Sequence, residues 1–351
     1  MQTVFIPRER EGGENRVAAS PDTVKRLGAL GFEVVVEAGA GAASRIIDAD
    51  FAAAGATIGT ASDAARADVV LKVRRPTPTE YQGYKHGAAV LAIMDPYGNE
   101  AAIAGMAQAG ITAFAMELMP RITRAQVMDV LSSQANLAGY QAVIDGAAEY
   151  DRALPMMMTA AGTVPAAKVF IMGVGVAGLG AVVTATDVRP AAKEQVASLG
   201  AKFIAVEDEE FKQAETAGGY AKEMSAEYRA KQAALVAEHI KKQDIVITTA
   251  LIPGRPAPKL VSAEMVASMK PGSVLVDLAV ERGGNVEGAR PGEVAEVGNV
   301  KIVGHLNVPG RIAASASALY ARNLYAFVET MIDKEKKALA VNWDDDLVKA
   351  T

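Results

Sequence analysis

The sequence predicts an α/β protein made of two Rossmann-like domains with parallel sheets, which are linked by long helices. Apolar strand segments alternate with helical segments in both halves of the 351-residue chain, and this alternation is typical of parallel sheets covered by helices. A glycine-rich turn of the form G-x-G-x-x-G directly follows one strand segment, as in dinucleotide-binding folds. Arg124–Asp151 predicts a long helix that bridges the halves, and residues from Ile312 to about Lys337 predict a second that returns to the first domain. We therefore expect a first domain of residues 1–123 plus 312–351 and a second of residues 124–311.

The first half contains a clear helix start. Ser20 is a good N-cap, Pro21 suits the first helical position and Asp22 adds an acid to the first turn. These residues predict a helix through Leu30 that Gly31 ends. Two shorter helical pieces are expected at Ala49–Ala54 and Ser62–Ala65. The strands expected in this half are Thr3–Pro7, Phe32–Glu37, Asp68–Val73, Ala88–Met94 and Ile111–Glu117.

The second half repeats the pattern. Runs such as Ile245-Val246-Ile247 and Val274-Leu275-Val276 are apolar without alternation, which suits a sheet covered on both faces. The expected strands are Val169–Gly173, Ala181–Val188, Lys202–Val206, Asp244–Ala250, Ser273–Ala279 and Lys301–His305, and the expected helices are Pro190–Leu199, Ser225–Lys242 and Ser262–Met269. Glu207–Ser225 is polar and long for a connection, so we expect a mobile functional loop there.

The composition excludes several classes of function. The chain has 36 Lys and Arg against 41 Asp and Glu, a net charge of −5, so no basic footprint indicates nucleic acid. The absence of cysteine excludes disulfides and thiolate metal sites. The three histidines, His86, His239 and His305, have no metal-ligand spacing. Val169–Thr186 carries no charge, but its four glycines and two β-rich halves predict two buried strands and no direct membrane insertion.

The glycine turn predicts a dinucleotide site. Its first glycine makes the tight turn, its second lets the backbone approach a pyrophosphate, and its third lets helix and strand pack closely. The acid that ends the next strand, Asp187, is of the kind that binds a ribose. The alternative interpretation is a glycine turn that only packs two strands. The residues of the turn are Gly173, Val174, Gly175, Val176, Ala177 and Gly178.

The spacing after this turn departs from the usual pattern. Asp187 lies nine residues beyond Gly178, whereas the acid usually lies about 20 residues beyond the glycines. A parallel crossover normally needs a dozen or more residues, so the crossover helix is missing from this sequence. Three explanations stay open. The sequence omits residues that the protein has, or the deletion is real, or Ala181–Val188 pairs elsewhere and carries Asp187 away from the site.

A second polar cluster lies at the start of the bridging helix. Arg121 lies in a loop, and Gln126, Asp129 and Ser132 are three residues apart on the helix expected from Arg124. Their amide, carboxylate and hydroxyl groups could bind a carboxamide. A solvated helix face explains the same spacing equally simply.

With these motifs, the chain resembles the soluble nucleotide-binding alpha subunit (domain I) of proton-translocating NAD(P) transhydrogenase. The resemblance runs almost from end to end. The stretches that carry it are MELMPRI (116–122), LSSQANLAGY (131–140), MMMTAAGT (156–163), AGGYAKEM (217–224) and TTALIPG (248–254).

The resemblance implies a function and a set of partners. NADH would bind to this chain and pass hydride to NADP(H) on a separate NADP-binding subunit, while a membrane subunit couples the transfer to proton movement. The chain would form a homodimer in the cytoplasm, peripheral at the inner face of the membrane. The resemblance also implies that Gln126 and Asp129 take part in catalysis. The implied cofactor-binding residues are Arg121, Gln126, Asp129, Ser132, Gly173, Val174, Gly175, Gly178, Asp187, Val188, Arg189, Tyr220, Ala250 and Leu251.

Two alternatives remain. Alanine dehydrogenase shares this fold, and Arg16 and Lys72 fit its substrate-carboxylate positions. That enzyme needs an acid/base group, but the position of its catalytic histidine reads Met94-Asp95-Pro96 here, and its catalytic aspartate is Glu281. The second alternative is an inactive scaffold subunit, because loss of the crossover helix would remove backbone amides and a helix dipole from the pyrophosphate site.

Overall fold

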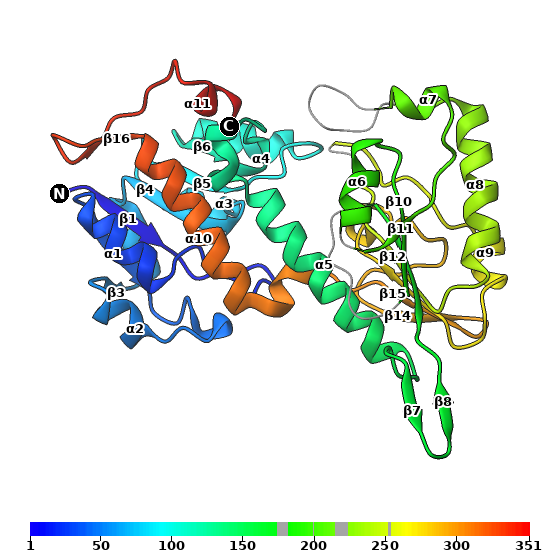
Figure 1. Cartoon of the computed structure of the whole chain (residues 1–351). Helices are drawn as coiled ribbons and strands as arrows, with labels where there is room; N and C mark the ends of the chain where they lie inside the picture. The colour runs from blue at the N-terminus through cyan, green and yellow to red at the C-terminus, as the bar shows by residue number, and fades with distance from the viewer. Residues whose placement is uncertain (174–181, 199, 215–223, 252–253) are drawn as a thin grey trace. The chain divides into compact units, whose positions relative to one another are not determined.

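The computed structural model describes residues 1–173, 182–198, 200–214, 224–251 and 254–351 (Figure 1). The chain divides into two compact units, Met1–Leu137 with Pro309–Thr351, and Ala138–Val308. The first division falls within helix α5 (Val130–Glu149). Each unit contains a parallel, Rossmann-like sheet, so the predicted fold class is confirmed.

The sheet of the first unit has six parallel strands in the order β3-β2-β1-β4-β5-β6, which is a doubly wound order. At its centre Val4 pairs with Val34 on one side and with Val69 on the other. The five predicted strands are confirmed, and the short edge strand β3 was missed. The strands are β1 (Thr3–Ile6), β2 (Glu33–Glu37), β3 (Thr57–Gly59), β4 (Val69–Arg74), β5 (Ala89–Ile93) and β6 (Thr112–Ala115).

Helices cover both faces of this sheet because successive strand residues point to opposite sides. Val4 and Leu71 pack on one face against α1 (Pro21–Ala29) and α10 (Ala313–Thr330). Phe5 and Val70 belong to the core of the other face, with α4. The remaining helices of the unit are α2 (Asp48–Ala53), α3 (Pro78–Tyr81), α4 (Glu100–Gln108), α11 (Asp346–Ala350) and the 3₁₀ segments Ala42–Ser44, Ala61–Arg66, Met116–Leu118, Thr123–Met128 and Val308–Ile312.

The start of α1 is as predicted. The Ser20 hydroxyl accepts from the Thr23 amide at 3.2 Å, and the Thr23 hydroxyl accepts from the Ser20 amide at 2.9 Å. This reciprocal pair is a capping box, which satisfies amides that the first helical turn leaves free. The terminal helix is shorter than predicted, because α10 ends at Thr330 and the chain then forms the small hairpin of β16 (Ile332–Asp333) and β17 (Ala338–Leu339).

The sheet of the second unit has the order β11-β10-β9-β12-β13-β15-β14, and only β14 is antiparallel. One face packs on α5 and α6, and the other on α8 and α9. Its strands are β9 (Lys168–Met172), β10 (Val182–Thr186), β11 (Lys202–Phe203), β12 (Ile245–Thr248), β13 (Val274–Asp277), β14 (Val294–Val297) and β15 (Val300–Val303), and its helices are α6 (Ala191–Ser198), α7 (Glu209–Lys212), α8 (Ala226–Ile240), α9 (Ala263–Ala267) and the 3₁₀ turn Val280–Arg282.

The connection expected at Glu207–Ser225 contains one short helix that was not predicted. The Asp208 side chain accepts from the Phe211 amide at 3.1 Å and so caps α7. Phe211 is buried, which anchors this stretch. Residues 215–223 of the expected loop lie outside the described residues.

One explanation of the short spacing is now excluded. β10 pairs with β9 in parallel, from Val182 opposite Lys168 to Thr186 opposite Met172. Asp187 is therefore not carried away but follows β10 at the same sheet edge where Gly173 follows β9. Nine residues, Gly173–Ala181, connect the two strands. An extended run of that length reaches about 30 Å, enough to return along a five-residue strand but too short to include a full crossover helix.

The predicted helix from Arg124 is wrong at its start. Residues Thr123–Met128 form a 3₁₀ segment, Asp129 has a non-helical backbone, and α5 begins only at Val130. The Asp129 carboxylate accepts from the Ser132 amide at 2.9 Å. Asp favours such a capping position over a helix interior, because its side chain competes with the helical backbone for hydrogen bonds.

The segment after α5 was not predicted. It forms an exposed hairpin of β7 (Met157–Thr159) and β8 (Gly162–Val164), which extends away from its own sheet (Figure 1). Within the parts of the chain that the structure describes, no helix is both long and apolar enough to cross a bilayer.

Candidate nucleotide-binding site

The carboxyl edge of the second sheet brings the glycine turn and the acidic residue together. β9 lies between β10 and β12, so Gly173, Asp187 and Thr249 each follow one of three neighbouring strands. The Gly173 amide donates to the Thr186 carbonyl at 2.9 Å. This is the edge at which open α/β sheets bind ligands.

Only glycine fits at position 173. Its φ is +102°, a left-handed conformation that side-chain-bearing residues rarely adopt. A Cβ placed there would lie 2.3 Å from the Thr249 hydroxyl oxygen. That hydroxyl donates to the Gly173 carbonyl at 3.2 Å, so the two residues are locked in close contact. Backbone geometry and space both exclude a side chain, which leaves the peptide surface open to a ligand.

The acid of the site is paired with an arginine two residues away. The carboxylate of Asp187 accepts from the amide and the Nε of Arg189, both at 2.9 Å, and from its Nη2 at 2.8 Å. Asp187 is 9% exposed, whereas the Arg189 side chain is 29% exposed. The pair holds the carboxylate in a fixed orientation at the end of β10. Val188 lies between them.

A buried asparagine fixes the turn after β12. Asn285, which is fully buried, accepts from the Ala250 amide at 3.0 Å and donates to the Ala250 carbonyl at 2.9 Å. It also donates to the Pro258 carbonyl at 2.8 Å. Ala250 is thus anchored on both sides, and the next residue, Leu251, is half exposed. Asn285 was not predicted, because nothing local marks a residue whose partner is 35 positions away.

Asp277 supports the neighbouring strand end. Its carboxylate, which follows β13, accepts from the amides of Ala279 at 2.9 Å and Val286 at 3.0 Å. Burial raises the pKa of Asp277, although these amide bonds oppose the rise. Sequence reasoning missed this residue too, although a lone polar residue that ends an apolar strand was a usable signal. Four residues of the predicted site, Val174, Gly175, Gly178 and Tyr220, lie outside the described residues.

The predicted cluster of the first unit forms a helix cap. Asp129 accepts from the amide and hydroxyl of Ser132, at 2.9 Å and 2.6 Å. Gln126 is exposed on the preceding 3₁₀ segment, and Arg121 is exposed in the loop before it. The structure therefore brings Asp129 and Ser132 together, but as a capping pair and not as two positions of one helix face.

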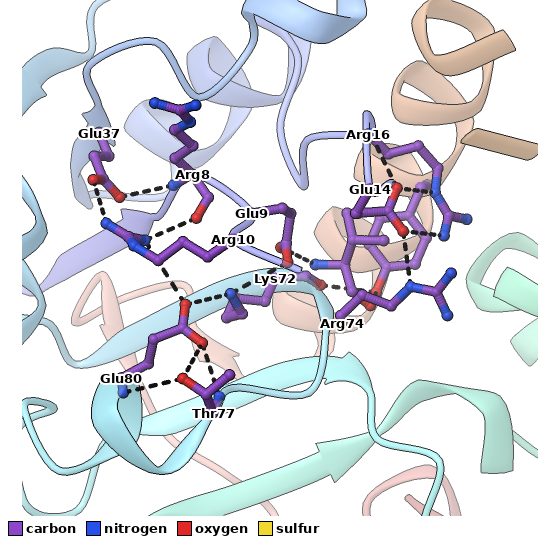
Figure 2. Close-up of polar contacts among 12 residues, drawn as sticks. Arg8, Glu9, Arg10, Glu14, Arg16, Glu37, Lys72, Arg74, Thr77 and Glu80 are labelled. Carbon is purple, nitrogen blue, oxygen red and sulfur yellow. Dashed lines mark hydrogen bonds and ion pairs between the residues drawn. The ribbon is translucent and has the colours of Figure 1, made fainter. Parts of the chain in front are cut away.

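A buried charge network lies at the carboxyl ends of β1 and β4 in the same unit (Figure 2). Arg16 donates from Nε and Nη2 to the two oxygens of Glu14, each at 2.8 Å, and from Nη1 to the Gln134 side-chain oxygen at 2.8 Å. Arg74 adds a bond to Glu14 at 2.8 Å. Burial alone would raise the pKa of Glu14, but the bonds and charge of Arg16, with the charge of Arg74, lower it to about 2.

Lys72 occupies the other half of the network. Its ammonium lies 2.8 Å from Glu80 and 3.2 Å from Glu9. Burial raises the pKa of Glu9 despite the nearby lysine, whereas in Glu80 the charge and hydrogen bond of Lys72 outweigh burial and lower the pKa. Both positions expected for a substrate carboxylate in alanine dehydrogenase, Arg16 and Lys72, therefore lie in this network, each bound to carboxylates of the chain itself.

The acid/base positions of alanine dehydrogenase have no equivalent chemistry here. Met94 is fully buried, and its amide donates to Glu117 at 3.1 Å. Glu281 is exposed after β13 and accepts from the Asn307 amide at 3.4 Å. Among the described residues no group of His, Asp or Glu is arranged to bind a metal.

Comparison with known proteins places both units. The N-terminal domain of the family described as alanine dehydrogenase/PNT matches residues 5–138, and its C-terminal domain matches residues 142–351. The chain is 56% identical over 365 residues to the first of the proteins that make up NAD(P) transhydrogenase subunit alpha of Rhodospirillum rubrum, and the match covers 99% of this chain and 95% of that protein.

Two further relatives are similar over most of the chain. The crystal structure of transhydrogenase from Sinorhizobium meliloti matches with a TM-score of 0.91 and 69% identity, and the match covers 100% of this chain and 97% of that one. Alanine dehydrogenase of Mycobacterium tuberculosis is 35% identical over 302 residues, 82% of this chain and 75% of that protein. The resemblance inferred from the sequence is confirmed: the chain belongs to the alanine dehydrogenase/PNT family and contains both of its domains.

Proposed function

We propose that this chain is the NAD(H)-binding subunit of an NAD(P) transhydrogenase. In this role it passes hydride between NADH bound here and NADP(H) on a partner subunit, and a membrane domain couples that transfer to proton translocation. The likeness to transhydrogenase alpha subunits over almost the whole chain carries the proposal. It makes the chain an oxidoreductase subunit that depends on its partners for the second half of the reaction.

The described residues at the carboxyl edge of the second sheet fit a dinucleotide. Gly173 leaves its peptide open, because a Cβ there would meet the Thr249 hydroxyl. The Asp187 carboxylate can accept hydroxyl protons from a ribose, and Arg189 keeps it charged and oriented. Ala250 and Leu251 present an anchored turn with an exposed apolar side chain beside them. Val174, Gly175, Gly178, Val188 and Tyr220 complete the proposed set.

The first unit would contribute the groups around the reacting ring. Bound NADH would supply the hydride, so no acid/base group of the protein is required. Gln126 and Arg121 are exposed at the surface and carry donors that suit a carboxamide oxygen. Asp129 and Ser132 would present their remaining hydrogen-bonding capacity from the N-terminus of α5. Gln126 and Asp129 are the proposed catalytic residues.

Alanine dehydrogenase activity is not supported. The amine chemistry of that enzyme needs a proton-transferring group, and this chain has a buried methionine where the histidine is expected. The expected aspartate is replaced by the exposed Glu281. We therefore expect no ammonia-dependent reduction of pyruvate.

The inactive scaffold remains a second candidate, because one observation favours it. The nine residues between β9 and β10 are too few for a crossover helix, whose N-terminus normally supplies amides to the pyrophosphate. The match to the R. rubrum protein spans 365 aligned residues against 351 in this chain, so that relative has at least 14 residues without a counterpart here. We infer that NADH binds more weakly to this chain than to such relatives.

The proposed assembly is a homodimer at the inner, cytoplasmic face of the membrane, bound to an NADP-binding subunit and a membrane subunit. The exposed β7–β8 hairpin supports a protein contact, because Met157 and Met158 are 45% and 80% exposed and exposed apolar groups of this kind mark interaction surfaces. No nucleic acid is expected as a partner.

Calorimetric titration tests the proposal. NADH should bind, with an affinity below that of the R. rubrum relative, and NADPH should not bind at the same concentrations. The matched control is Asp187→Asn, which keeps the shape of the side chain but removes the charge that orients the ribose contact, and it should weaken NADH binding. Absence of any NADH heat at millimolar concentration would favour the scaffold.

A further inference from the structure

Asn323 is a buried polar residue on the long helix α10. It is 7% exposed, and α10 otherwise contributes apolar side chains such as Leu324 and Phe327 to the core. A buried amide among such neighbours is costly unless both of its ends are hydrogen-bonded. Both ends are bonded here, and both bonds go to the segment that carries the proposed catalytic residues.

The two bonds of Asn323 lie on either side of Asp129. The Nδ2 donates to the Val127 carbonyl at 2.8 Å, and the Oδ1 accepts from the Ser133 hydroxyl at 2.7 Å. Val127 precedes Asp129 by two residues and Ser133 follows it by four. One rigid amide therefore joins the end of the 3₁₀ segment to the first turn of α5.

The same segment is anchored elsewhere but remains open where the chemistry is proposed. Ala125 and Met128 are buried in the core, and the Arg124 guanidinium forms an ion pair with Asp345 through both of its terminal nitrogens. Between these anchors Gln126 and Val127 are exposed. The side chain of Gln126 is therefore accessible to a ligand, while its backbone depends on the anchors for its position.

We propose that Asn323 is a positioning residue for hydride transfer, which sets where Gln126 and Asp129 meet the nicotinamide. The proposal rests on the proposed transhydrogenase function. Asn323 makes neither of its bonds with the reactive groups themselves. It acts through the Val127 carbonyl and the Ser133 hydroxyl, and so fixes the backbone on both sides of Asp129. Displacement of a reacting group by about 1 Å can cost about a hundredfold in rate.

The amide is chemically specific for this role. Aspartate has the same shape and can still accept from Ser133, but it cannot donate to the Val127 carbonyl and would place a negative charge against it. Asn323→Asp therefore breaks one bond and keeps the other. Ser133→Ala breaks the opposite bond and leaves the Val127 contact intact. Tyr325→Phe is the matched control, since it removes a hydroxyl on the same helix that donates to Glu329 at 3.1 Å.

The experiment measures three quantities on the full chain and its variants: NADH affinity, the single-turnover rate of hydride transfer to NADP on the partner subunit, and hydrogen exchange of amides 124–133. In Asn323→Asp we expect a rate at saturating NADH reduced about a hundredfold, NADH affinity within about twofold of wild type because the adenosine and pyrophosphate contacts are untouched, and faster exchange confined to amides 124–133. Ser133→Ala should show a smaller loss, and Tyr325→Phe none.

The outcomes separate the two levels of the proposal. A wild-type chain that binds NADH but transfers no hydride would overturn the transhydrogenase function, and the positioning role with it. An active wild type with an unchanged rate or unchanged local exchange in Asn323→Asp would overturn the positioning role alone. A loss of rate that merely follows a general loss of folded protein, with exchange raised throughout the unit, would also overturn it.

Discussion

Gly173 and Asp187 show that single positions at one sheet edge determine whether this chain can hold a dinucleotide. Gly173 is required by backbone conformation and by the nearby Thr249, and Asp187 is oriented by Arg189. Asn285 and Asp277 then fix the neighbouring turns from below. The chemistry at this edge depends on a few hydrogen bonds and contacts, each of which a single substitution can test.

Gly173→Ala should both destabilise the chain and weaken NADH binding. The left-handed conformation costs about 1–2 kcal/mol for a residue with a Cβ, and the contact 2.3 Å from the Thr249 oxygen adds a steric cost of about 1–3 kcal/mol. Gly200→Ala is the matched control, because its φ is +77° with nothing near the added Cβ. Denaturant unfolding and calorimetry should show the conformational cost in both variants and the binding loss only in Gly173→Ala.

Glu14 should give the first unit a distinct sensitivity to acid. Its folded-state pKa of about 2 lies below the ordinary value of 4.5, so its ionised form stabilises the fold at neutral pH, and this stability is lost as pH falls from about 4.5 to about 2. The difference corresponds to about 3 kcal/mol. Burial gives Glu9 the opposite shift, so the effect has to be measured by substitution.

In Glu14→Gln the free energy of unfolding should fall less between pH 5 and pH 2 than in wild type. Glu33→Gln is the control, since Glu33 also has a pKa lowered by an arginine, Arg66, but is exposed, and exposed pairs contribute little. Equal pH dependence of wild type and Glu14→Gln would show that the Glu14–Arg16 pair does not stabilise the folded unit.

At the scale of elements, local signals were predictable and distant partners were not. Ser20 marked the start of α1 correctly because a capping box involves residues three apart. Asp129 misled the prediction because its spacing from Gln126 and Ser132 also fits one face of a helix, while the structure uses its preference for an N-cap. Asn285 and Asn323 could not be identified, since the partners that explain them, Ala250 and Val127, lie at least 35 residues away in sequence.

The parallel pairing of β9 and β10 could not be derived from the sequence. The short connection left open whether β10 belongs beside β9, and spacing alone could not decide it. The paired register places Asp187 at the expected edge, so the short connection, and not the strand order, separates this chain from the usual pattern. The two parallel sheets themselves were predictable, because their strands are long apolar runs between helices.

Insertion of a crossover helix should strengthen NADH binding. A helical segment of about a dozen residues placed between Gly180 and Ala181 would supply a helix N-terminus to the glycine turn, and NADH affinity measured by calorimetry should rise. A flexible Gly/Ser insertion of equal length is the control and should give no gain. If both insertions leave the affinity unchanged, the missing helix is not what limits binding.

At the scale of the whole molecule, the chain combines two Rossmann-like units of one family with surfaces for partners. The first unit presents a structured segment around Asp129, and the second presents the glycine turn and Asp187. The β7–β8 hairpin adds exposed methionines that no described residue of this chain covers. We attribute this exposed hairpin to the proposed homodimer.

Met157→Asp with Met158→Asp should shift the chain toward a monomer in sedimentation analysis without lowering its unfolding temperature as a monomer. Buried charges without partners are strongly unfavourable at an interface, whereas the same charges on an exposed hairpin cost little. Ile47→Asp, at a residue 61% exposed in the other unit, is the control and should leave the oligomeric state unchanged. A stable dimer in the double variant would exclude the hairpin as its contact.

The proposed role as the NADH side of a transhydrogenase is tested most directly by stopped-flow measurement of hydride transfer. The chain is mixed with an NADP-binding subunit of a transhydrogenase, and oxidation of NADH is followed as the NADH concentration is raised. We predict hydride transfer to NADP that saturates only at higher NADH than for the R. rubrum relative, with no ammonia-dependent reduction of pyruvate. No transfer at saturating NADH, or reduction of pyruvate by the chain alone, would contradict it.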